Sequence, residues 1–173
     1  MPIPAFAHHP DPAIDALVRE VIGSLPQVKK SLETDGVPPG SAPMSREQQD
    51  ALFQIVQQLC EQEHFFHAAP LALFLAVHHP KDRRYSFCAG RAFQRLAAFD
   101  AAVVFYEMCL QEHRAPAVMY RLGECLAGLG RADEAVRLFD AAFDLARGID
   151  QYRNLQDAAE QAIERLRSAT ASA

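Results

Sequence analysis

A cysteine and two histidines are spaced so that they could bind a metal ion. Cys60, His64 and His67 follow the pattern i, i+4, i+7, which one continuous helix would place on a single face. Thiolate sulfur and imidazole nitrogen are ligands that Zn²⁺ prefers, but a structural zinc site needs four ligands and no fourth is evident. The helix is also expected to break near His64. We therefore expect no metal and no cofactor.

The remaining reactive side chains form no catalytic pattern. The sequence has no G-x-S-x-G, P-loop or H-E-x-x-H motif. The acidic pairs Glu61/Glu63 and Asp133/Glu134 are typical of solvated helix faces and helix N-termini. Four cysteines are present without a C-x-x-C pair, which favours small core residues in a reduced, cytoplasmic compartment. They are Cys60, Cys88, Cys109 and Cys125. We expect no catalytic residue and no enzyme.

Binding chemistry is better represented, because an aromatic ring recurs at one position in three related segments: Phe53, Phe87 and Tyr120. An extended peptide needs apolar pockets at intervals, with polar groups nearby for its backbone. The alternative is that these rings belong to the hydrophobic core. Phe65, at a turn position, is expected to pack inside and only border the site. The predicted peptide-binding groove comprises Phe53, Gln57, Cys60, Phe65, Arg84, Phe87, Arg91, Gln94, Tyr120 and Glu124.

An internal repeat would position these residues. Gly90 and Gly123 are each followed twelve residues later by an alanine, Ala102 and Ala135, and then by an aromatic residue four positions further on. A weaker copy around Ala68 has Val56 at the glycine position. Small residues at this spacing indicate two antiparallel helices that cross closely, and stacked copies bury a continuous core.

The pattern predicts an all-α fold of three tetratricopeptide-type helix hairpins, which form a short solenoid with a concave groove. Gly130 would lie in the turn of the third hairpin, and Pro70 is tolerable only in the first turn of its helix. The expected segments are an arm at 1–44, the repeat region 45–150 with repeats at about 49–82, 83–115 and 116–149, and a capping helix at 151–168.

The N-terminal arm contains an amphipathic helix, predicted for residues 12–25 and ended by Pro26. A Pro/Gly-rich linker follows at 34–43. The apolar face of the helix must be buried on its own repeats or on a second copy, and we expect a homodimer. The expected dimerisation residues are Ile14, Leu17, Val18, Val21, Ile22 and Leu25.

Composition restricts the possible partners. Half of the 173 residues are hydrophobic, which is enough for a core, and the net charge is −5. That charge argues against a nucleic acid or an acidic membrane surface as the main partner. No stretch is apolar enough to insert directly into a membrane, and no secretory signal is evident at the N-terminus.

Two segments carry a resemblance to a known family. They are R-R-Y-S-F-C-A-G-R-A-F-Q-R-L-A-A-F-D-A-A at 83–102 and P-A-V-M-Y-R-L-G-E-C-L-A-G-L-G-R-A-D-E-A at 116–135. The run G-E-C-L-A-x-L-G resembles A-E-C-L-x-x-x-G in the class II chaperones of bacterial type III secretion systems, the SycD/LcrH type. The resemblance extends from about Ser45 to the C-terminal helix, and the order of elements is also similar.

The resemblance implies a cytoplasmic chaperone that binds an extended segment of a pore-forming translocator and keeps it soluble before export. It also implies a homodimer formed through the N-terminal helix and, in some members, an AraC-type transcription activator as a further partner. Family members have aromatic groove residues at the positions of Phe53, Cys60 and Phe65, and Cys60 departs from that pattern. The alternatives are a regulatory adaptor for such an activator and a generic peptide-binding scaffold.

Overall fold

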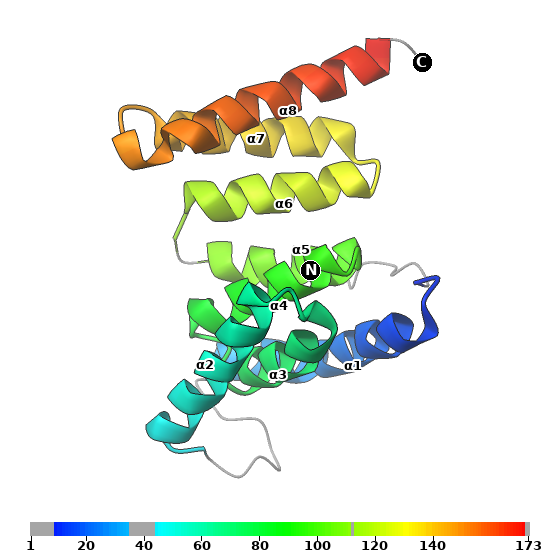
Figure 1. Cartoon of the computed structure of the whole chain (residues 1–173), viewed down its shortest axis with the longest axis vertical. Helices are drawn as coiled ribbons and strands as arrows, with labels where there is room; N and C mark the ends of the chain where they lie inside the picture. Colours follow the sequence, from blue (N-terminus) through cyan, green and yellow to red (C-terminus); the bar gives the residue numbers. More distant parts are fainter. Residues whose placement is uncertain (1–8, 35–43, 112, 172–173) are drawn as a thin grey trace. The chain divides into compact units, whose positions relative to one another are not determined.

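The computed structural model describes residues 9–34, 44–111 and 113–171, and all regular structure in these ranges is helical. Figure 1 shows the elements in chain order. The helices are α1 (Pro12–Thr34), α2 (Arg46–Glu61), α3 (Phe65–His78), α4 (Arg83–Arg95), α5 (Phe99–Leu110), α6 (Pro116–Gly128), α7 (Ala132–Ala146) and α8 (Arg153–Ala171), with a short 3-10 turn at Asp150–Tyr152 before α8.

The chain forms two compact units, Met1–Met108 and Cys109–Ala173, and the division falls inside α5. In the first unit α3 packs against α1, α2 and α4, and α4 also lies against α2. In the second unit α7 packs between α6 and α8, as the stacked yellow and red helices of Figure 1 show. None of the described helices combines the length and apolar character that crossing a bilayer requires.

The three hairpins turn in the same way. Glu63, Ala97 and Gly130 occupy equivalent positions and have positive φ angles of 60°, 57° and 74°. In each turn the N–H of the next residue donates to the carbonyl five positions earlier; the three bonds are His64 to Leu59 at 2.8 Å, Ala98 to Phe93 at 3.0 Å and Arg131 to Leu126 at 2.9 Å. This is the Schellman motif that ends a helix on a left-handed residue. Only the third hairpin uses glycine at that residue.

The repeat glycines mark close crossings of helices, as expected. A Cβ atom at Gly90 would lie 2.8 Å from Cε1 of Tyr106, and one at Gly123 would lie 2.7 Å from Cε1 of Phe139. Both rings are buried, as are the alanines of the pattern. The ring therefore fills the space that a side chain on the opposite helix would otherwise occupy.

The first hairpin fills its helix crossing with a different pair of residues. Val56 stands at the glycine position, and the position equivalent to Tyr106 is Ala72; both are fully buried. A larger residue on the first helix accompanies a smaller one on the second. Core packing depends on summed volume, so the two arrangements are equivalent ways to fill a helix crossing.

The N-terminal helix is longer than predicted. α1 continues past Pro26 to Thr34, so the prediction that Pro26 ends it near residue 25 was wrong. Proline removes one helical hydrogen bond without preventing the next turn from forming. The predicted linker lies mostly at 35–43, outside the described residues.

α1 packs against α3 of its own chain. Ile14, Val18 and Val21 are buried there, with Val21 at 0% exposure, whereas Leu17 and Ile22 are half-buried. The side chain of Leu25 lies outside the described residues. Part of the predicted dimerisation face is therefore buried within one chain.

Two helix positions differ from expectation. Pro70 is the sixth residue of α3 and lies inside the helix rather than in its first turn, because α3 begins at Phe65. The predicted capping helix begins at Arg153 and continues to Ala171.

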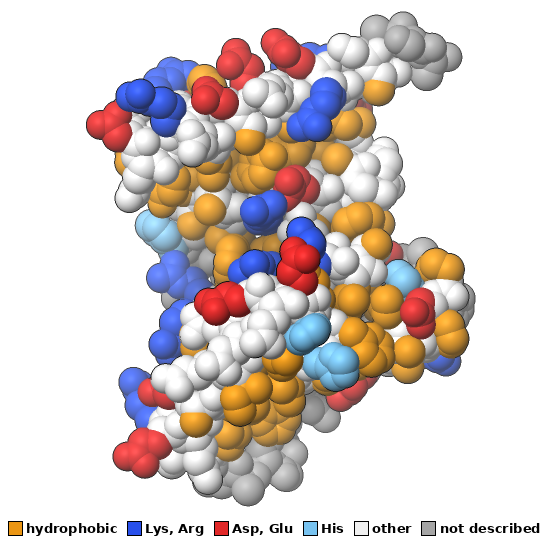
Figure 2. All heavy atoms as spheres, in the orientation of Figure 1, with side chains coloured by type: hydrophobic (Ala, Val, Ile, Leu, Met, Phe, Trp, Pro, Cys, Tyr) orange, Lys and Arg blue, Asp and Glu red, His pale blue; other side chains and the backbone are white. Residues whose placement is uncertain are grey.

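Hydrophobic side chains also remain exposed between charged ones on the face in Figure 2. Over the described residues as a whole, the large exposed hydrophobic side chains are Ile55, Phe66, Phe74, Leu145 and Ile149.

Candidate peptide-binding site

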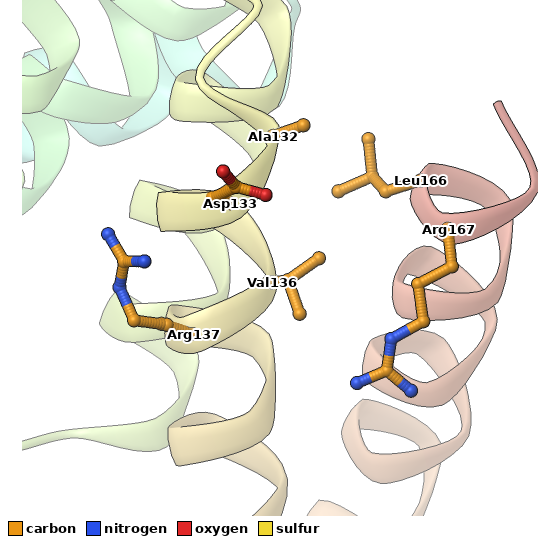
Figure 3. A pocket seen from close by; sticks show the side chains of 6 residues that line it. All are labelled: Ala132, Asp133, Val136, Arg137, Leu166 and Arg167. Atoms are coloured by element: carbon orange, nitrogen blue, oxygen red, sulfur yellow. The ribbon is translucent and has the colours of Figure 1, made fainter. Parts of the chain in front are cut away.

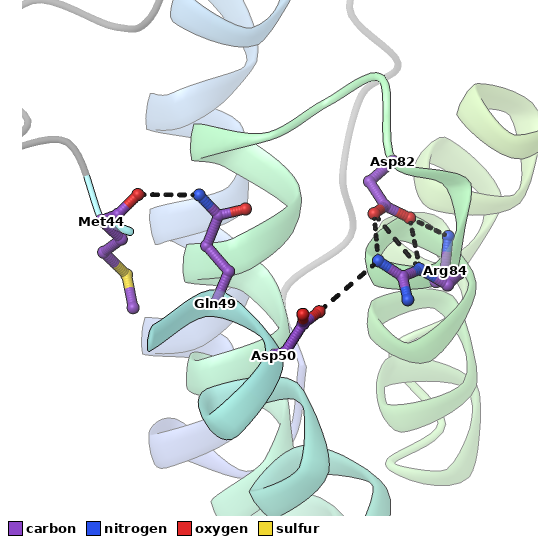
Figure 4. A network of polar contacts seen from close by, with 5 residues as sticks. All are labelled: Met44, Gln49, Asp50, Asp82 and Arg84. Carbon is purple, nitrogen blue, oxygen red and sulfur yellow. Dashed lines mark hydrogen bonds and ion pairs between the residues drawn. The ribbon is translucent and has the colours of Figure 1, made fainter. Parts of the chain in front are cut away.

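The first helices of the first two repeats lie side by side, and an arginine joins their N-terminal ends. Nη2 of Arg84 on α4 lies 2.7 Å from Oδ2 of Asp82 and 3.9 Å from Oδ1 of Asp50 on α2. Figure 4 shows this network. Asp82 is also the N-cap of α4 and accepts a hydrogen bond from the Arg84 backbone N–H at 3.0 Å. Burial raises the pKa of Asp82, but the bonds and charge of Arg84 outweigh it and lower that pKa.

The same arginine covers a predicted groove ring. Its guanidinium carbon lies 5.3 Å from the centre of the Phe53 ring and 5.5 Å from that of Tyr85. Phe53 and Tyr85 meet edge to face with centroids 5.2 Å apart. Phe53 is only 9% exposed, so its ring contributes to the core while its outer surface is in contact with Arg84.

A second arginine has the same arrangement at the other end of these helices. The guanidinium of Arg95 lies 5.0 Å from the centre of the Phe65 ring, and its Nη2 donates to Oε1 of Glu63 at 3.1 Å. Phe65 is buried, as expected for a residue that packs behind the site. We refer to the surface formed by Asp50, Phe53, Gln57, Cys60, Glu63, Phe65, Arg84, Phe87, Arg91 and Arg95 as the α2–α4 face.

The middle of the α2–α4 face is polar on the outside and apolar beneath. Gln57 and Arg91 are exposed, Cys60 is buried, and Cys88 is half-buried. Burial raises the pKa of Cys88 to about 11, the neighbouring Cys60 adds to that increase, and the charge of Arg91 opposes it. Both thiols therefore stay protonated at neutral pH, which agrees with a packing role.

Phe87 and Gln94 lie on the flank of α4 that faces α5. The rings of Phe87 and Tyr106 have centroids 5.9 Å apart, and the hydroxyl of Tyr106 donates to Oε1 of Gln94 at 2.7 Å. Phe87 and Gln94 are each partly exposed. Phe87 is thus available to a ligand on one side and supported by a buried ring on the other.

The second unit carries the remaining predicted residues on α6. Tyr120 is half-buried, with its ring 5.3 Å from that of Phe139 and 5.8 Å from the guanidinium of Arg121. Glu124 is also half-buried and accepts a hydrogen bond from Nη1 of Arg121 at 2.8 Å. Burial raises the pKa of Tyr120, and Glu124 adds to the effect, so its hydroxyl remains a hydrogen-bond donor at neutral pH.

Sequence reasoning missed the arginine that covers Phe65 and the tyrosine that supports Phe53. Arg95 stands eleven residues after Arg84 and four after Arg91, a spacing that places all three on one stripe of α4. That spacing could have identified Arg95 as a residue of the same surface from the sequence alone. The contact of Tyr85 with Phe53 depends on how α2 and α4 pack, and no local pattern indicates it.

The residues considered for a metal site are separated by a helix boundary. Cys60 is buried near the end of α2, whereas His64 precedes α3 and is exposed, as is His67. Within the described ranges no three histidine, cysteine or acidic residues are grouped to hold a metal ion. Cys125 is fully buried, and burial raises its pKa to about 12.

A small pocket lies away from the predicted site, between α7 and the end of α8. Its volume is about 230 Å³. Figure 3 shows Ala132 and Val136 of α7 facing Leu166 of α8 across it. Asp133, Arg137 and Arg167 complete the lining. None of the predicted groove residues borders this pocket.

Three solved structures illustrate the similarity of the fold. SycD of Yersinia enterocolitica, solved with a peptide of the translocator YopD, has a TM-score of 0.69 and 18% identity over 75% of this chain and 99% of that chain. PcrH of Pseudomonas aeruginosa has a TM-score of 0.65 and 22% sequence identity, over 72% of this chain and 95% of that chain. A chain of a type III secretion complex from Aeromonas hydrophila has a TM-score of 0.68 and 20% sequence identity, over 92% of this chain and 98% of that chain.

PcrH has also been solved with the chaperone binding regions of PopD and of PopB. No protein-family profile and no curated protein sequence matches this chain. The all-α, tetratricopeptide-like prediction is confirmed: the fold of this chain is the fold of the type III secretion translocator chaperones.

Proposed function

We propose that the chain is a chaperone of a type III secretion system, which binds an extended segment of a translocator protein and keeps it soluble in the cytoplasm before export. It acts by binding and has no catalytic step. The observation that carries the proposal is the likeness to SycD and PcrH over nearly the whole length of those proteins, which have been solved with segments of such clients.

The residues of the proposed site support this function. Phe87 and Tyr120 stand at equivalent repeat positions, are partly exposed, and each rests against a buried ring, Tyr106 and Phe139 respectively. A supported ring with one free side suits an apolar anchor of a peptide, because little side-chain freedom is lost on binding. The polar residues beside them can satisfy the peptide backbone.

The proposal includes a homodimer formed through α1. With Ile14, Val18 and Val21 buried on α3, the residues of α1 available to a second copy include Leu17 and Ile22. A regulatory adaptor for an AraC-type activator would use the same rings, and a pull-down with purified activator in place of the translocator distinguishes that alternative.

Co-expression tests the main proposal. A translocator encoded beside this chain should move from the insoluble to the soluble fraction, and the two proteins should elute together in size-exclusion chromatography. We expect Phe87→Ala and Tyr120→Ala each to weaken client binding at least tenfold, because truncating a ring that anchors a partner costs about 2 kcal/mol or more. Isothermal titration calorimetry measures the change.

Phe66→Ala is the matched control, because Phe66 is an exposed ring on α3 that is not part of the proposed site. It should leave client binding unchanged. Circular dichroism and thermal melting of the three variants show whether each still folds. A client that stays insoluble, or a complex that does not form with the wild-type chain, contradicts the proposal; loss of folding in both ring variants assigns the rings to the core.

A further inference from the structure

Among the residues that the structure describes, one arginine at the centre of the α2–α4 face has no acidic partner. Arg91 is exposed, and no described carboxylate lies within ion-pair distance of it. Arg84 and Arg95, on the same stripe of α4, are both held by acids, at 2.7 Å by Asp82 and at 3.1 Å by Glu63 respectively. The two outer arginines are thus occupied, and the middle one is open to a ligand.

The equivalent positions in the other repeats show that this charge is specific to the second repeat. Gln57 is neutral, and Glu124 is matched by Arg121 at 2.8 Å. Burial raises the pKa of both Cys60 on α2 and Cys88 on α4, and the charge of Arg91 opposes that increase at both thiols, which places its guanidinium near both helices. Arg91 also follows the half-exposed Phe87 by one helical turn.

The α2–α4 face carries three arginines, Arg84, Arg91 and Arg95, and two acids, Asp50 and Glu63, which pair with the outer arginines. Its unbalanced charge is therefore the positive charge of Arg91. α4 carries Arg83, Arg84, Arg91 and Arg95 and no acidic residue within its bounds. A guanidinium offers paired N–H donors that match the geometry of a carboxylate, and nearby apolar rings strengthen the attraction by excluding water. A carboxylate from a partner would meet no negatively charged side chain on α4.

We infer that Arg91 binds an acidic side chain of the client, next to the apolar residue that contacts Phe87. The inference rests on the proposed function and specifies its ligand: an extended segment that carries an aspartate or glutamate beside its hydrophobic anchor. The competing possibility is that Arg91 donates hydrogen bonds to peptide carbonyls and does not distinguish acidic from neutral side chains of the client.

Selection of short random peptides displayed on phage against the immobilised full-length chain separates these possibilities. On the wild-type chain we expect enrichment of an apolar residue with an acidic residue at a fixed distance from it. Arg91→Gln should keep the apolar residue and lose the acidic one, and Arg91→Glu should select lysine or arginine in its place. Fluorescence polarisation then measures the best wild-type peptide against its Asp→Asn or Glu→Gln version.

The expected loss for neutralising either partner is roughly tenfold, as for a charged hydrogen bond, and the neutral peptide should bind wild type and Arg91→Gln equally. Arg137→Glu, an exposed arginine of α7, is the control for altered net charge and should select the same peptides as wild type. Circular dichroism confirms that all variants are folded.

Four outcomes would overturn a claim. If wild type enriches apolar peptides without an acidic residue, or if Arg91→Glu still selects acidic ones, the inference is wrong and the proposed function remains. If no peptide is enriched on wild type, the proposed function itself is contradicted and the inference falls with it. If Phe87→Ala enriches the same apolar anchor as wild type does, the anchor does not contact Phe87, and the inference is wrong while the proposed function remains.

Discussion

Gly123 and Phe139 share one space in the third repeat, and their contact leads to a direct test. A methyl group at Gly123 would lie 2.7 Å from Cε1 of the buried Phe139 ring. We expect Gly123→Ala to lower the free energy of unfolding by about 1–3 kcal/mol, the usual cost of overpacking a core. Urea denaturation followed by circular dichroism measures the change.

Gly23 is the matched control, because it lies inside α1 and a Cβ atom there would meet nothing within 4 Å. Gly23→Ala should raise stability by about 0.5–1 kcal/mol, since alanine loses less conformational freedom in a helix. Combining Gly123→Ala with Phe139→Leu should recover part of the loss. Equal effects of the two glycine substitutions would show that the ring contact is unimportant.

At the scale of single residues, the sequence predicts those contacts that follow from regular spacing along the chain. The interval between Gly90 and Ala102 predicted a close crossing because only a small residue fits there, and Tyr106 confirms it. The pairing of Arg84 and Arg95 with rings could not be predicted, because a cation–π contact depends on the conformation of a long side chain and on a neighbouring helix.

The hairpin turns give a prediction at the scale of an element. Ala97 has a φ of 57°, in the left-handed region that costs an L-residue roughly 1–2 kcal/mol, and its side chain is exposed. Ala97→Gly should raise the free energy of unfolding by about 0.5–1 kcal/mol, since part of the relief is offset by the greater freedom of glycine in the unfolded chain.

The reverse substitution is the control. Gly130→Ala, at the equivalent turn of the third hairpin, should destabilise the protein by about 1 kcal/mol, because its φ of 74° is also left-handed. Differential scanning calorimetry measures both variants. A loss of stability in Ala97→Gly would contradict the assignment of strain to this turn.

The existence of most helices was readable from the sequence, but some boundaries were not. The repeated spacing of small residues and the predicted turn at Gly130 matched the observed hairpins. Pro26 and Pro70 were expected at helix ends and lie inside helices. Proline weakens a helix locally, and packing of the surrounding turns can outweigh that cost, which no local pattern shows.

At the scale of the whole molecule, the centre and the edge of the apolar stripe of α1 should have separable roles. Val21 is fully buried on α3, whereas Leu17 is half-buried. We expect Val21→Ala to lower the thermal midpoint while the mass stays that of a dimer, because a core cavity costs stability. Leu17→Glu should convert the dimer to a monomer with little change in the melting of each subunit.

Multi-angle light scattering measures the mass, and Ala16→Glu, an exposed position on the same helix, controls for the added charge. A wild-type chain that is monomeric at micromolar concentration contradicts the dimer, and a dimeric Leu17→Glu variant excludes this edge of the α1 stripe from the dimer interface. The sequence could not separate these roles, because one apolar stripe serves equally for burial within a chain and between chains.

The crossings in the repeats also bear on how the chain can change over evolution. Gly90 with Tyr106 and Val56 with Ala72 are two solutions for the same pair of positions. Changing one member alone would leave the crossing overpacked or hollow, so we expect the two positions to change together. Among divergent relatives they should covary, with glycine accompanying a ring and valine accompanying alanine.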